Sequence, residues 1–369
     1  MNRMIDLGIG TFFSDIKKAL SSARVLGIDI GTTSIKLVEV GKRGEILTLE
    51  NYALLETKDY LSRGNAAIQT SALRISERDV SQLLTKMIKE TNLKTKNAIV
   101  SIPIYNAFFV TIDMPTLSPN EAATALKFQV KQYIPLPIDQ VNIEWVKMDS
   151  FQNERGQDMS RYLIVAVPIA TINTLKRIFD GVGINLRALE VEHQSFIRAL
   201  LSPTDPIVQI VDIGGESTGI YIIEGGISKR STQIDSGGSS LTKSLARSLD
   251  ISTLRAEDLK KRKGLVGSGG EYEISQALYP FLDVIFNECA RIRTEFERTS
   301  RKKVSEMVLV GGGANLSGID EYVKETTGLP VKTTDAFRRF VIPSEIESIR
   351  KQVGRTFASA SGLALRYFV

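Results

Sequence analysis

The 369-residue sequence has one cysteine, one histidine and one tryptophan. A single cysteine cannot form an internal disulfide, so the sequence favours a reducing compartment. Zinc sites of the usual kind are excluded because they need several cysteine or histidine ligands. Cys289 falls on the apolar stripe of a helix predicted over 279–297, and we interpret it as a core residue.

Long hydrophobic runs are also missing. No run of about 20 apolar residues occurs, so no transmembrane helix is predicted. The first residues, MNRMIDLGIGTFFSDIKKAL, lack the order of a secretory signal. Residues 1–22 do contain an apolar helical stripe beside Lys17 and Lys18. This stripe fits a membrane-surface or partner-docking segment, a helix packed on the protein itself, or a disordered end.

The composition is that of a soluble globular protein, with 43% hydrophobic and 24% charged residues. The length suits two lobes of roughly 150 to 200 residues each. The net charge is +5, with basic clusters at 260–263 and 301–303. No aromatic residues are interleaved with these clusters for base stacking, so we interpret them as solvated faces and predict no nucleic-acid binding.

The strongest signal is a pattern that occurs twice. VLGIDIGTTSIKLVEV begins at Val25, and IVDIGGESTGIYIIEGG begins at Ile210. Asp29, Gly31 and Ser34 align at a constant offset with Asp212, Gly214 and Ser217. Each copy predicts a β-hairpin with a tight turn rich in glycine, serine and threonine.

This turn chemistry points to a bound phosphate. Glycine allows a close backbone approach, and the N–H groups and hydroxyls of such a turn can hold phosphate oxygens. An aspartate before the turn would repel bare phosphate, which implies a cation between them, and Mg²⁺ prefers oxygen ligands of this kind. Two opposed hairpins therefore predict a site that holds a metal–triphosphate from both sides.

A third glycine-rich element is MVLVGGGANLSGIDEYV, from Met307. Its three glycines fit a phosphate loop, a flat backbone surface for a base, or a purely structural strand–helix turn. It is not a P-loop, because no GKS or GKT follows, and Leu316 stands where the G-x-G-x-x-G pattern needs glycine.

The remaining chain alternates strand and helix signals, which is typical of α/β folds. Pro135 and Pro137 predict an extended segment. The sequence LRALEVEHQSFIRALL passes from a strand into a helix close to Glu192. The predicted strands are 97–104, 107–115, 141–148 and 161–169, and the predicted helices start at Asn120 or cover 171–180, 241–249, 254–263, 279–297 and 354–368.

Two Asp-x-Gly hairpins followed by a strand–GGG turn resemble the actin, Hsp70 and sugar kinase superfamily. Within it, LGIDIGTTSIKLVEV, YIPLPIDQV, DIGGEST and GLALR are similar to the PilM family of type IV pilus assembly, with the FtsA family as a relative. The resemblance covers about residues 24–369. It implies an α/β, actin-like (ribonuclease H-like) two-lobed ATPase fold with an inserted small α/β subdomain. The implied division is a segment 1–22, subdomain 1A (23–96, 187–204 and 352–369), subdomain 1C (97–186), subdomain 2A (205–235 and 301–351) and subdomain 2B (236–300).

The resemblance also implies roles for individual residues. Asp29 and Asp212 would hold Mg²⁺ through waters. Lys36 would reach the phosphates or lie on a strand surface, and Glu216 must face away from phosphate or meet the metal. The implied ATP site is lined by Gly31, Thr32, Thr33 and Ser34, by Gly214, Gly215, Glu216 and Ser217, by Gly237 and Gly238, by Gly311, Gly312 and Gly313 at adenine, and by Lys243, Glu257 and Lys260 near the ribose and base. For these last three a solvated helix face fits equally well.

The function implied is that of a cytoplasmic ATP-binding scaffold at the inner membrane, in pilus assembly and twitching motility. It would bind the N-terminal cytoplasmic segment of PilN in a nucleotide-dependent manner, in a groove beside the inserted subdomain. Other pilus platform proteins and a second copy of the chain are further candidate partners. Membrane association would be indirect or through residues 1–22.

Catalysis is expected to be slow or absent. Glu192 is the candidate for positioning an attacking water, whereas His193 fits a hydrogen-bonded structural residue. One alternative is an FtsA-like, filament-forming division protein, which would need a C-terminal amphipathic membrane helix where this sequence ends in LALRYFV. The other is a small-molecule kinase, which would need a general base beyond the metal aspartates.

Overall fold

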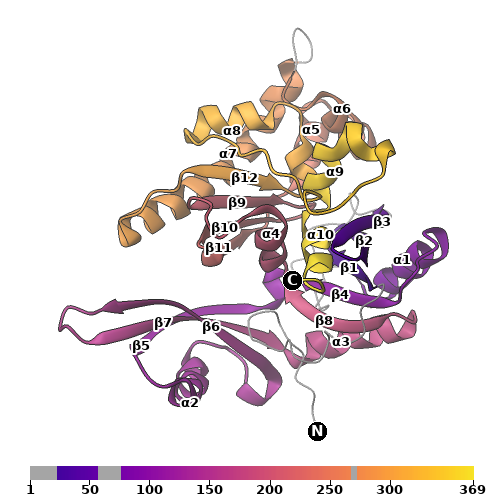
Figure 1. The fold of residues 1–369 in the computed structure, drawn as a ribbon. Helices are drawn as coiled ribbons and strands as arrows, with labels where there is room; N and C mark the ends of the chain where they lie inside the picture. The colour runs from indigo at the N-terminus through magenta and orange to yellow at the C-terminus, as the bar shows by residue number, and fades with distance from the viewer. Residues whose placement is uncertain (1–22, 57–75, 267–271) are drawn as a thin grey trace.

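The computed structural model describes residues 23–56, 76–266 and 272–369, which form three β-sheets with flanking helices (Figure 1). The candidate membrane-surface or docking segment 1–22 lies outside the described residues. Within those ranges, no helix has the length and apolar character needed to cross a bilayer.

The first lobe is built on a five-stranded sheet of order β3-β2-β1-β4-β8. Strands β1 (Arg24–Ile30), β2 (Ser34–Arg43) and β3 (Ile46–Glu56) are antiparallel neighbours, while β4 (Asn97–Ile102) and β8 (Asn185–Val191) continue the sheet in parallel. Alternate side chains of β1 enter different cores, because successive residues of a strand point to opposite faces. Leu26 and Ile28 pack with helices α1 (Glu77–Glu90) and α3 (Ile169–Gly181), and Val25 packs with α4 (Glu192–Leu200) and α10 (Ala358–Leu365).

The second lobe repeats this plan with a four-stranded sheet of order β11-β10-β9-β12. Strands β9 (Val208–Ile213), β10 (Thr218–Glu224) and β11 (Ile227–Ile234) are antiparallel, and β12 (Glu306–Val310) is parallel to β9. The helices of this lobe are α5 (Gly238–Ser248), α6 (Thr253–Lys263), α7 (Tyr272–Ser300) and α8 (Ile319–Thr327). Cys289 on α7 is fully buried, which confirms it as a core residue, and burial raises the pKa of its thiol.

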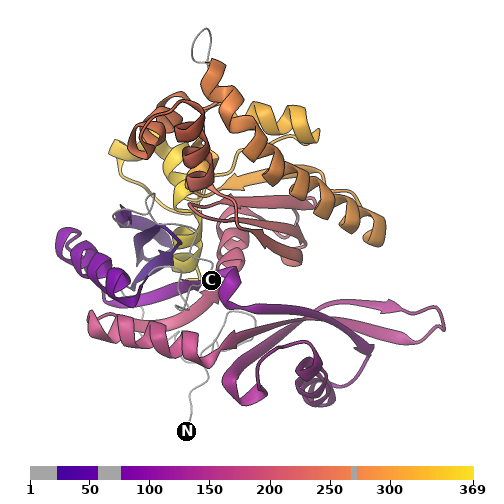
Figure 2. The ribbon, with the colours of Figure 1, turned by 180° about the vertical axis from the view of Figure 1, so that it is seen from behind.

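The insert, residues 104–168, lies between β4 and α3 and forms the third sheet, of order β5-β7-β6. Its strands are β5 (Phe108–Pro115), β6 (Val141–Gln152) and β7 (Asp158–Pro168). Helix α2 (Pro119–Gln129) covers one face, and a capping box of Ser118 and Glu121 begins it. Figures 1 and 2 show the insert extending beside the sheet of the second lobe.

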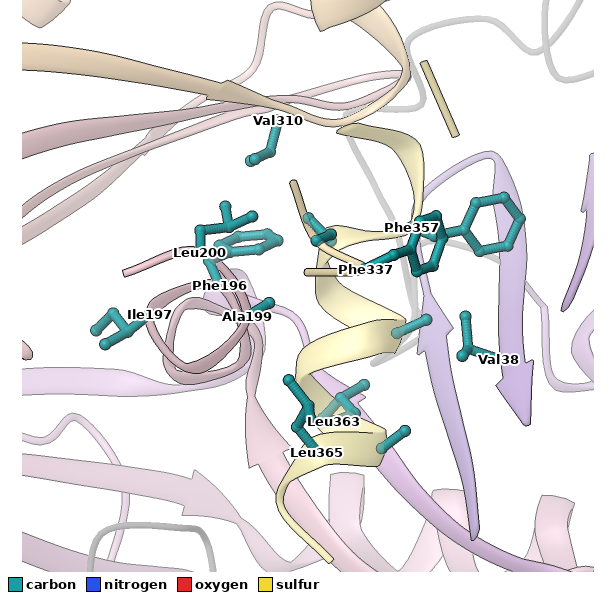
Figure 3. Packing of buried hydrophobic residues seen from close by; sticks show 14 of the residues in the cluster. Val38, Phe196, Ile197, Ala199, Leu200, Val310, Phe337, Phe357, Leu363 and Leu365 are labelled. Carbon is teal, nitrogen blue, oxygen red and sulfur yellow. The ribbon is translucent and has the colours of Figure 1, made fainter. Parts of the chain in front are cut away.

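Among the described residues, one hydrophobic cluster belongs to both lobes. Figure 3 shows Phe196 and Leu200 of α4 between Val310 of β12 and the side chains of α10. Helix α10 lies close against the first sheet, since a Cβ at Gly27 of β1 would be 1.9 Å from the Ala360 carbonyl oxygen. The lobes are therefore joined through α4 and α10.

The structure changes several predicted elements. The predicted terminal helix 354–368 is divided at Phe357 into α9 (Arg350–Thr356) and α10. After Pro137 the predicted extended segment becomes a short 3₁₀ turn, Ile138–Gln140. Strands β3 and β11 and helix α1 were not predicted. Other 3₁₀ turns are Ile104–Asn106, Val130–Gln132, Gly312–Asn315 and Ser344–Ile349.

Candidate functional site

The two repeated turns lie against each other. The first glycine turn (Gly31–Ser34) joins β1 to β2, and the second glycine turn (Gly214–Ser217) joins β9 to β10. The backbone N–H of Glu216 donates to Thr32 Oγ1 at 3.2 Å, and a Cβ at Gly215 would lie 2.2 Å from Thr33 Oγ1. The structure therefore brings together two segments that lie in different halves of the chain.

Both turns are closed by the same backbone bond. Gly31 N donates to Ser34 O at 2.9 Å, and Gly214 N donates to Ser217 O at 3.0 Å. The tight closure leaves the remaining N–H groups and hydroxyls of each turn at the junction of the lobes. Donors of this kind form the concave anion sites of many phosphate-binding proteins.

Asp29, at the end of β1, has two close partners. Its Oδ2 lies 3.0 Å from Lys36 Nζ, and its Oδ1 accepts a hydrogen bond from Ser101 Oγ at 2.8 Å. Lys36 stands opposite Asp29 in the β1–β2 register and is 14% exposed, so it points into the site rather than lying on an open strand surface. Burial alone would lower the pKa of Lys36, but the charges of nearby carboxylates outweigh it and raise that pKa.

Asp212 occupies the matching place in β9 and has different surroundings. The third glycine element lies directly against it, because a Cβ at Gly311 would be 2.3 Å from Asp212 Oδ1 and Gly311 has a φ of +87°. Burial raises the pKa of Asp212, the charge of Lys36 lowers it and that of Asp29 raises it, to about 6. A Cβ at Gly312, in contrast, would meet nothing within 4 Å, so this glycine borders open space.

Glu192 begins helix α4 directly after β8, as the sequence predicts, and lies at a junction of three parts of the molecule. Its Oε1 accepts hydrogen bonds from Tyr221 Oη of the second lobe at 3.0 Å and from Ile104 N of the insert at 3.4 Å. Burial, followed by the charges of Asp212 and Asp29, raises its pKa to about 8. At neutral pH this carboxyl is mostly protonated and is a poor general base.

His193 is fully buried between two aromatic rings. Its ring centroid lies 5.4 Å from those of Tyr221 and Phe109, and it stacks on Tyr221 at 28°. Burial lowers its pKa to about 4, so the imidazole is neutral at physiological pH. Nδ1 has no hydrogen-bond partner among the described residues, while Nε2 lies within hydrogen-bond distance of Gln194 Nε2, at 3.4 Å. The ring is therefore a structural residue held by packing and by this contact.

The second turn is supported from behind by the start of α5. Gly238 N donates to Gly214 O at 2.9 Å, and Ser239 N donates to Gly215 O at 2.7 Å. A Cβ at Gly237 would be 2.7 Å from Gly214 O, so only glycine allows this approach. The predicted glycine pair thus lies beside the second turn.

Lys260 and Glu257 of α6 do not form a solvated face. Lys260 Nζ lies 2.7 Å from Glu257 Oε2, and it donates to Gly238 O at 2.8 Å and to Thr242 Oγ1 at 2.7 Å. Burial lowers the pKa of Lys260, and Glu257 partly restores it. These contacts tie α6 to the first turn of α5, while Lys243 is half-buried on α5.

The carboxylate oxygens of this region fit a hydrated divalent cation beside a phosphate group. Asp29 and Asp212 place two carboxyl groups in a buried region where the charge of Lys36 acts on both. Within the described ranges, no three His, Cys, Asp or Glu side chains are arranged to ligate a metal directly. A cation here would therefore be held through waters on Asp29 and Asp212, as Mg²⁺ often is.

Sequence reasoning missed two residues of this region. Ser101 links β4 to the site, donating to Asp29 while its Oγ accepts from Ile30 N at 3.1 Å. Its only signal is a polar residue in the apolar strand sequence NAIVSI. Tyr221 lies in an apolar run, IYII, and nothing in that run marks its hydroxyl as a partner of Glu192.

Comparison with known proteins gives the same picture of fold and family. The family model described as type IV pilus assembly protein PilM matches residues 27–368. Cell division protein FtsA of Streptococcus pneumoniae is 22% identical over 341 residues, which cover 83% of this chain and 74% of that protein.

Solved structures show an actin-like fold. The PilM–PilN type IV pilus biogenesis complex superposes with a TM-score of 0.75 at 22% identity, covering 94% of this chain and 98% of that one. MreB 5 of Spiroplasma citri, bound to AMPPNP, has a TM-score of 0.51 at 14% identity, covering 92% and 94%. The predicted two-lobed, actin-like fold class is confirmed.

Proposed function

The chain belongs to the family of type IV pilus assembly protein PilM, and from this premise we propose that it is an ATP-binding scaffold at the cytoplasmic side of the inner membrane. Its proposed partner is the N-terminal cytoplasmic segment of PilN, bound in a nucleotide-dependent manner. The likeness to the solved PilM–PilN complex supports this choice of partner.

The contact between the two glycine turns carries the proposal for ATP. Glu216 N donates to Thr32 Oγ1 at 3.2 Å, so the two turns lie against each other, and each turn follows a strand that carries Asp29 or Asp212. We infer that the triphosphate lies there, with Mg²⁺ held through waters on the two aspartates. The bound metal would neutralise phosphate charge, and MreB 5 bound to AMPPNP has the same fold.

The remaining predicted site residues divide by position. Gly312, which borders open space, is placed to let a base approach the backbone, while Gly311 and Gly313 pack against Asp212 and Ile213. Lys260 and Glu257 would act on the ribose and base side by fixing the start of α5. Lys36 would meet phosphate while remaining paired with Asp29.

Hydrolysis is proposed to be slow. A water-activating carboxyl should be ionised and free to accept a proton. Glu192 is instead engaged by Tyr221 and Ile104, and its pKa is raised to about 8 by burial and neighbouring acids. The site therefore suits binding of ATP better than its turnover.

Calorimetry with Mg-ATP tests the nucleotide proposal. We expect the full chain to bind Mg-ATP and Asp212→Ala to bind it more weakly without loss of fold, as judged by circular dichroism. The matched control is Asp113→Ala, because Asp113 pairs with Arg161 inside the insert. Unchanged ATP affinity in Asp212→Ala would contradict the metal assignment.

A pulldown with the N-terminal PilN peptide tests the partner proposal separately. We expect capture of the chain, with a difference between samples with and without Mg-ATP. Equal capture in both samples would remove the nucleotide dependence and leave the scaffold. No capture in either sample would refute PilN as the partner.

Filament formation is a second candidate, favoured by the likeness to FtsA. Sedimentation of the full chain with Mg-ATP tests it. A pelleted fraction that grows with protein concentration would support filaments, and a chain that stays in the supernatant at all concentrations would exclude them.

A further inference from the structure

The insert is held by the second lobe as well as by the first lobe, from which it emerges. Lys229 of β11 donates to both carboxylate oxygens of Asp149 on β6, each at 2.9 Å. The Lys229 side chain is 8% exposed, and Glu224 lies at 4.0 Å as a second partner. Lys229 is the buried member of this pair, while the Asp149 side chain is 46% exposed. A pair with one buried member is less screened by water than a fully exposed pair, so it holds the two elements together more firmly.

A second set of contacts joins the same parts near the nucleotide site. Tyr221 of β10 donates to Glu192, which also accepts from Ile104 N, the first residue of the insert. His193 lies between the rings of Tyr221 and Phe109, and Phe109 belongs to β5 of the insert. The β10–β11 hairpin therefore contacts the insert directly through Lys229, and through α4 from Tyr221 in the middle of β10.

This hairpin is a continuous extension of the second glycine turn. Strand β10 begins at Thr218, the residue after the turn, and Thr218 Oγ1 donates to Ser236 O at 2.7 Å. The antiparallel register then pairs β10 with β11 along its length, with Thr218 opposite Ile234. A displacement of the turn must move the hairpin, because paired strands transmit motion as one body.

The same hairpin forms one wall of a groove of about 860 Å³. The opposite side is the face of the insert's sheet that does not carry α2, with Thr111, Arg161 and Leu163 among its residues. The β11 residues 228–231 and the end of α7 complete the groove. The volume of this groove thus depends on the separation of the insert from the second lobe.

We propose that the β10–β11 hairpin couples the second glycine turn to the insert, so that nucleotide at the turns sets the width of the groove between the insert and the second lobe. This inference rests on the proposed function, because it takes nucleotide as the ligand of the turns. The Lys229–Asp149 pair is the contact that makes the insert follow the hairpin, and the aromatic contacts of Tyr221 set the pivot.

A distance measurement across the groove tests this coupling. Glu154→Cys on the insert and Arg298→Cys on α7 replace exposed residues and accept spin labels, while the native Cys289 is buried and unreactive. We expect Mg-AMPPNP to change the mean label-to-label distance in this parent. Asp149→Asn combined with Lys229→Gln should abolish the change while calorimetry shows retained AMPPNP binding.

The matched control alters a different ion pair of the same groove and leaves both Lys229 and Asp149 in place. Asp113 and Arg161 form a bidentate pair that lines the same groove, yet both belong to the insert. Asp113→Asn, which keeps the charge of Arg161 opposite Asp149 in the β6–β7 register, should leave the distance change as in the parent. The single variant Asp149→Asn, at a half-exposed position, provides the same test should the double variant unfold.

The outcomes separate this inference from the proposed function. A parent that binds AMPPNP without a change in distance overturns the coupling and leaves the nucleotide proposal standing. An unchanged response after loss of the Lys229–Asp149 pair also overturns it. A parent that shows no nucleotide uptake in calorimetry refutes the proposed function itself, and the coupling with it.

Discussion

The first and second glycine turns have the same backbone closure, but their aspartates differ in hydrogen-bond partners. In the first, Asp29 is neutralised by Lys36 at 3.0 Å and bound by Ser101 at 2.8 Å. In the second, no hydrogen bond from the described residues reaches the carboxylate of Asp212, and Gly311 lies directly against it. The two copies therefore keep one geometry and differ in how they balance charge.

This difference indicates which half of the site responds to a ligand. A buried carboxylate with a cationic partner is already satisfied, whereas one without a hydrogen-bonding partner gains most from an incoming cation. The raised pKa of Asp212, due first to burial, shows that its ionised form is costly in the protein alone. Asp212 also belongs to the copy whose β10–β11 hairpin contacts the insert, through Lys229 and Asp149.

The largest effect is expected when the same Asp→Asn substitution is made separately at Asp29 and at Asp212. In nucleotide-free protein, Asp29→Asn removes the carboxylate that pairs with Lys36 at 3.0 Å and should lower the free energy of unfolding by about 3 kcal/mol. Asp212→Asn removes a carboxylate with a raised pKa and should raise the free energy of unfolding by about 1 kcal/mol. Urea unfolding at pH 7.5 measures both, and equal losses in the two variants would contradict the asymmetry.

The next effect tests the contact between the turns. In Gly215→Ala the new methyl would stand 2.2 Å from Thr33 Oγ1, so the turns must separate. We expect Mg-ATP affinity to fall about 30-fold, or about 2 kcal/mol. Gly181→Ala is the matched control, because a Cβ at Gly181 meets nothing within 4 Å. Equal ATP affinity of both variants in calorimetry would show that the contact does not matter for binding.

The part of this site that lies within the repeated pattern could be predicted from the sequence. The turns and their aspartates follow from local rules, since glycine-rich turns between apolar runs specify hairpins. The approach of one turn to the other, which brings Gly215 against Thr33, depends on how α4 and α10 pack between the lobes. Such long-range contacts leave no periodic signal in the sequence.

The unpredicted parts share a physical reason. Tyr221 and Ser101 act through single hydroxyls within apolar strands, and one polar atom does not change a strand pattern. The sequence does not distinguish whether Lys260 contacts a ligand or lies on a solvated helix face, because its helix is strongly polar throughout. Only the fold shows that it is buried against Gly238.

A third prediction concerns pH and the carboxyl group of Glu192, which Tyr221 and Ile104 contact. The pKa of Glu192 is raised from its usual 4.5 to about 8, so the folded protein keeps a proton that the unfolded chain loses. Its contribution to stability is present below about pH 4.5 and is lost as pH rises to about 8. Glu192→Gln should remove about 1 kcal/mol of the stability difference between pH 7 and pH 8.

Thermal or urea unfolding of nucleotide-free protein at several pH values measures this effect. Glutamine retains a carbonyl oxygen that accepts from Tyr221, so the variant should fold. Glu190→Gln would be a poor control, because it breaks a buried pair with Arg198, whereas the exposed Glu90→Gln leaves the region untouched. If the free energy of unfolding of Glu192→Gln still fell with pH as steeply as that of the wild type, another group would be responsible for the titration.

The smallest effect is expected where the lobes meet at an exposed contact. Lys261 of α6 lies 3.4 Å from Glu56 at the end of β3, with both side chains about half exposed. Water screens such a pair, and its partners keep wide conformational freedom, so Glu56→Gln should change the free energy of unfolding by less than about 0.5 kcal/mol. ATP affinity should change less than about twofold for the same reason.

This small effect separates two ways of joining the lobes. The Lys261–Glu56 contact spans the lobes as an exposed pair, whereas the contact of Gly215 with Thr33 joins them through close-packed backbone and side chain. If Glu56→Gln lost as much ATP affinity as Gly215→Ala, the exposed Lys261–Glu56 pair would matter for ATP binding as much as the contact between the turns. Calorimetry of the two variants in one buffer, at low and high salt, decides this, because only the ion pair should respond to ionic strength.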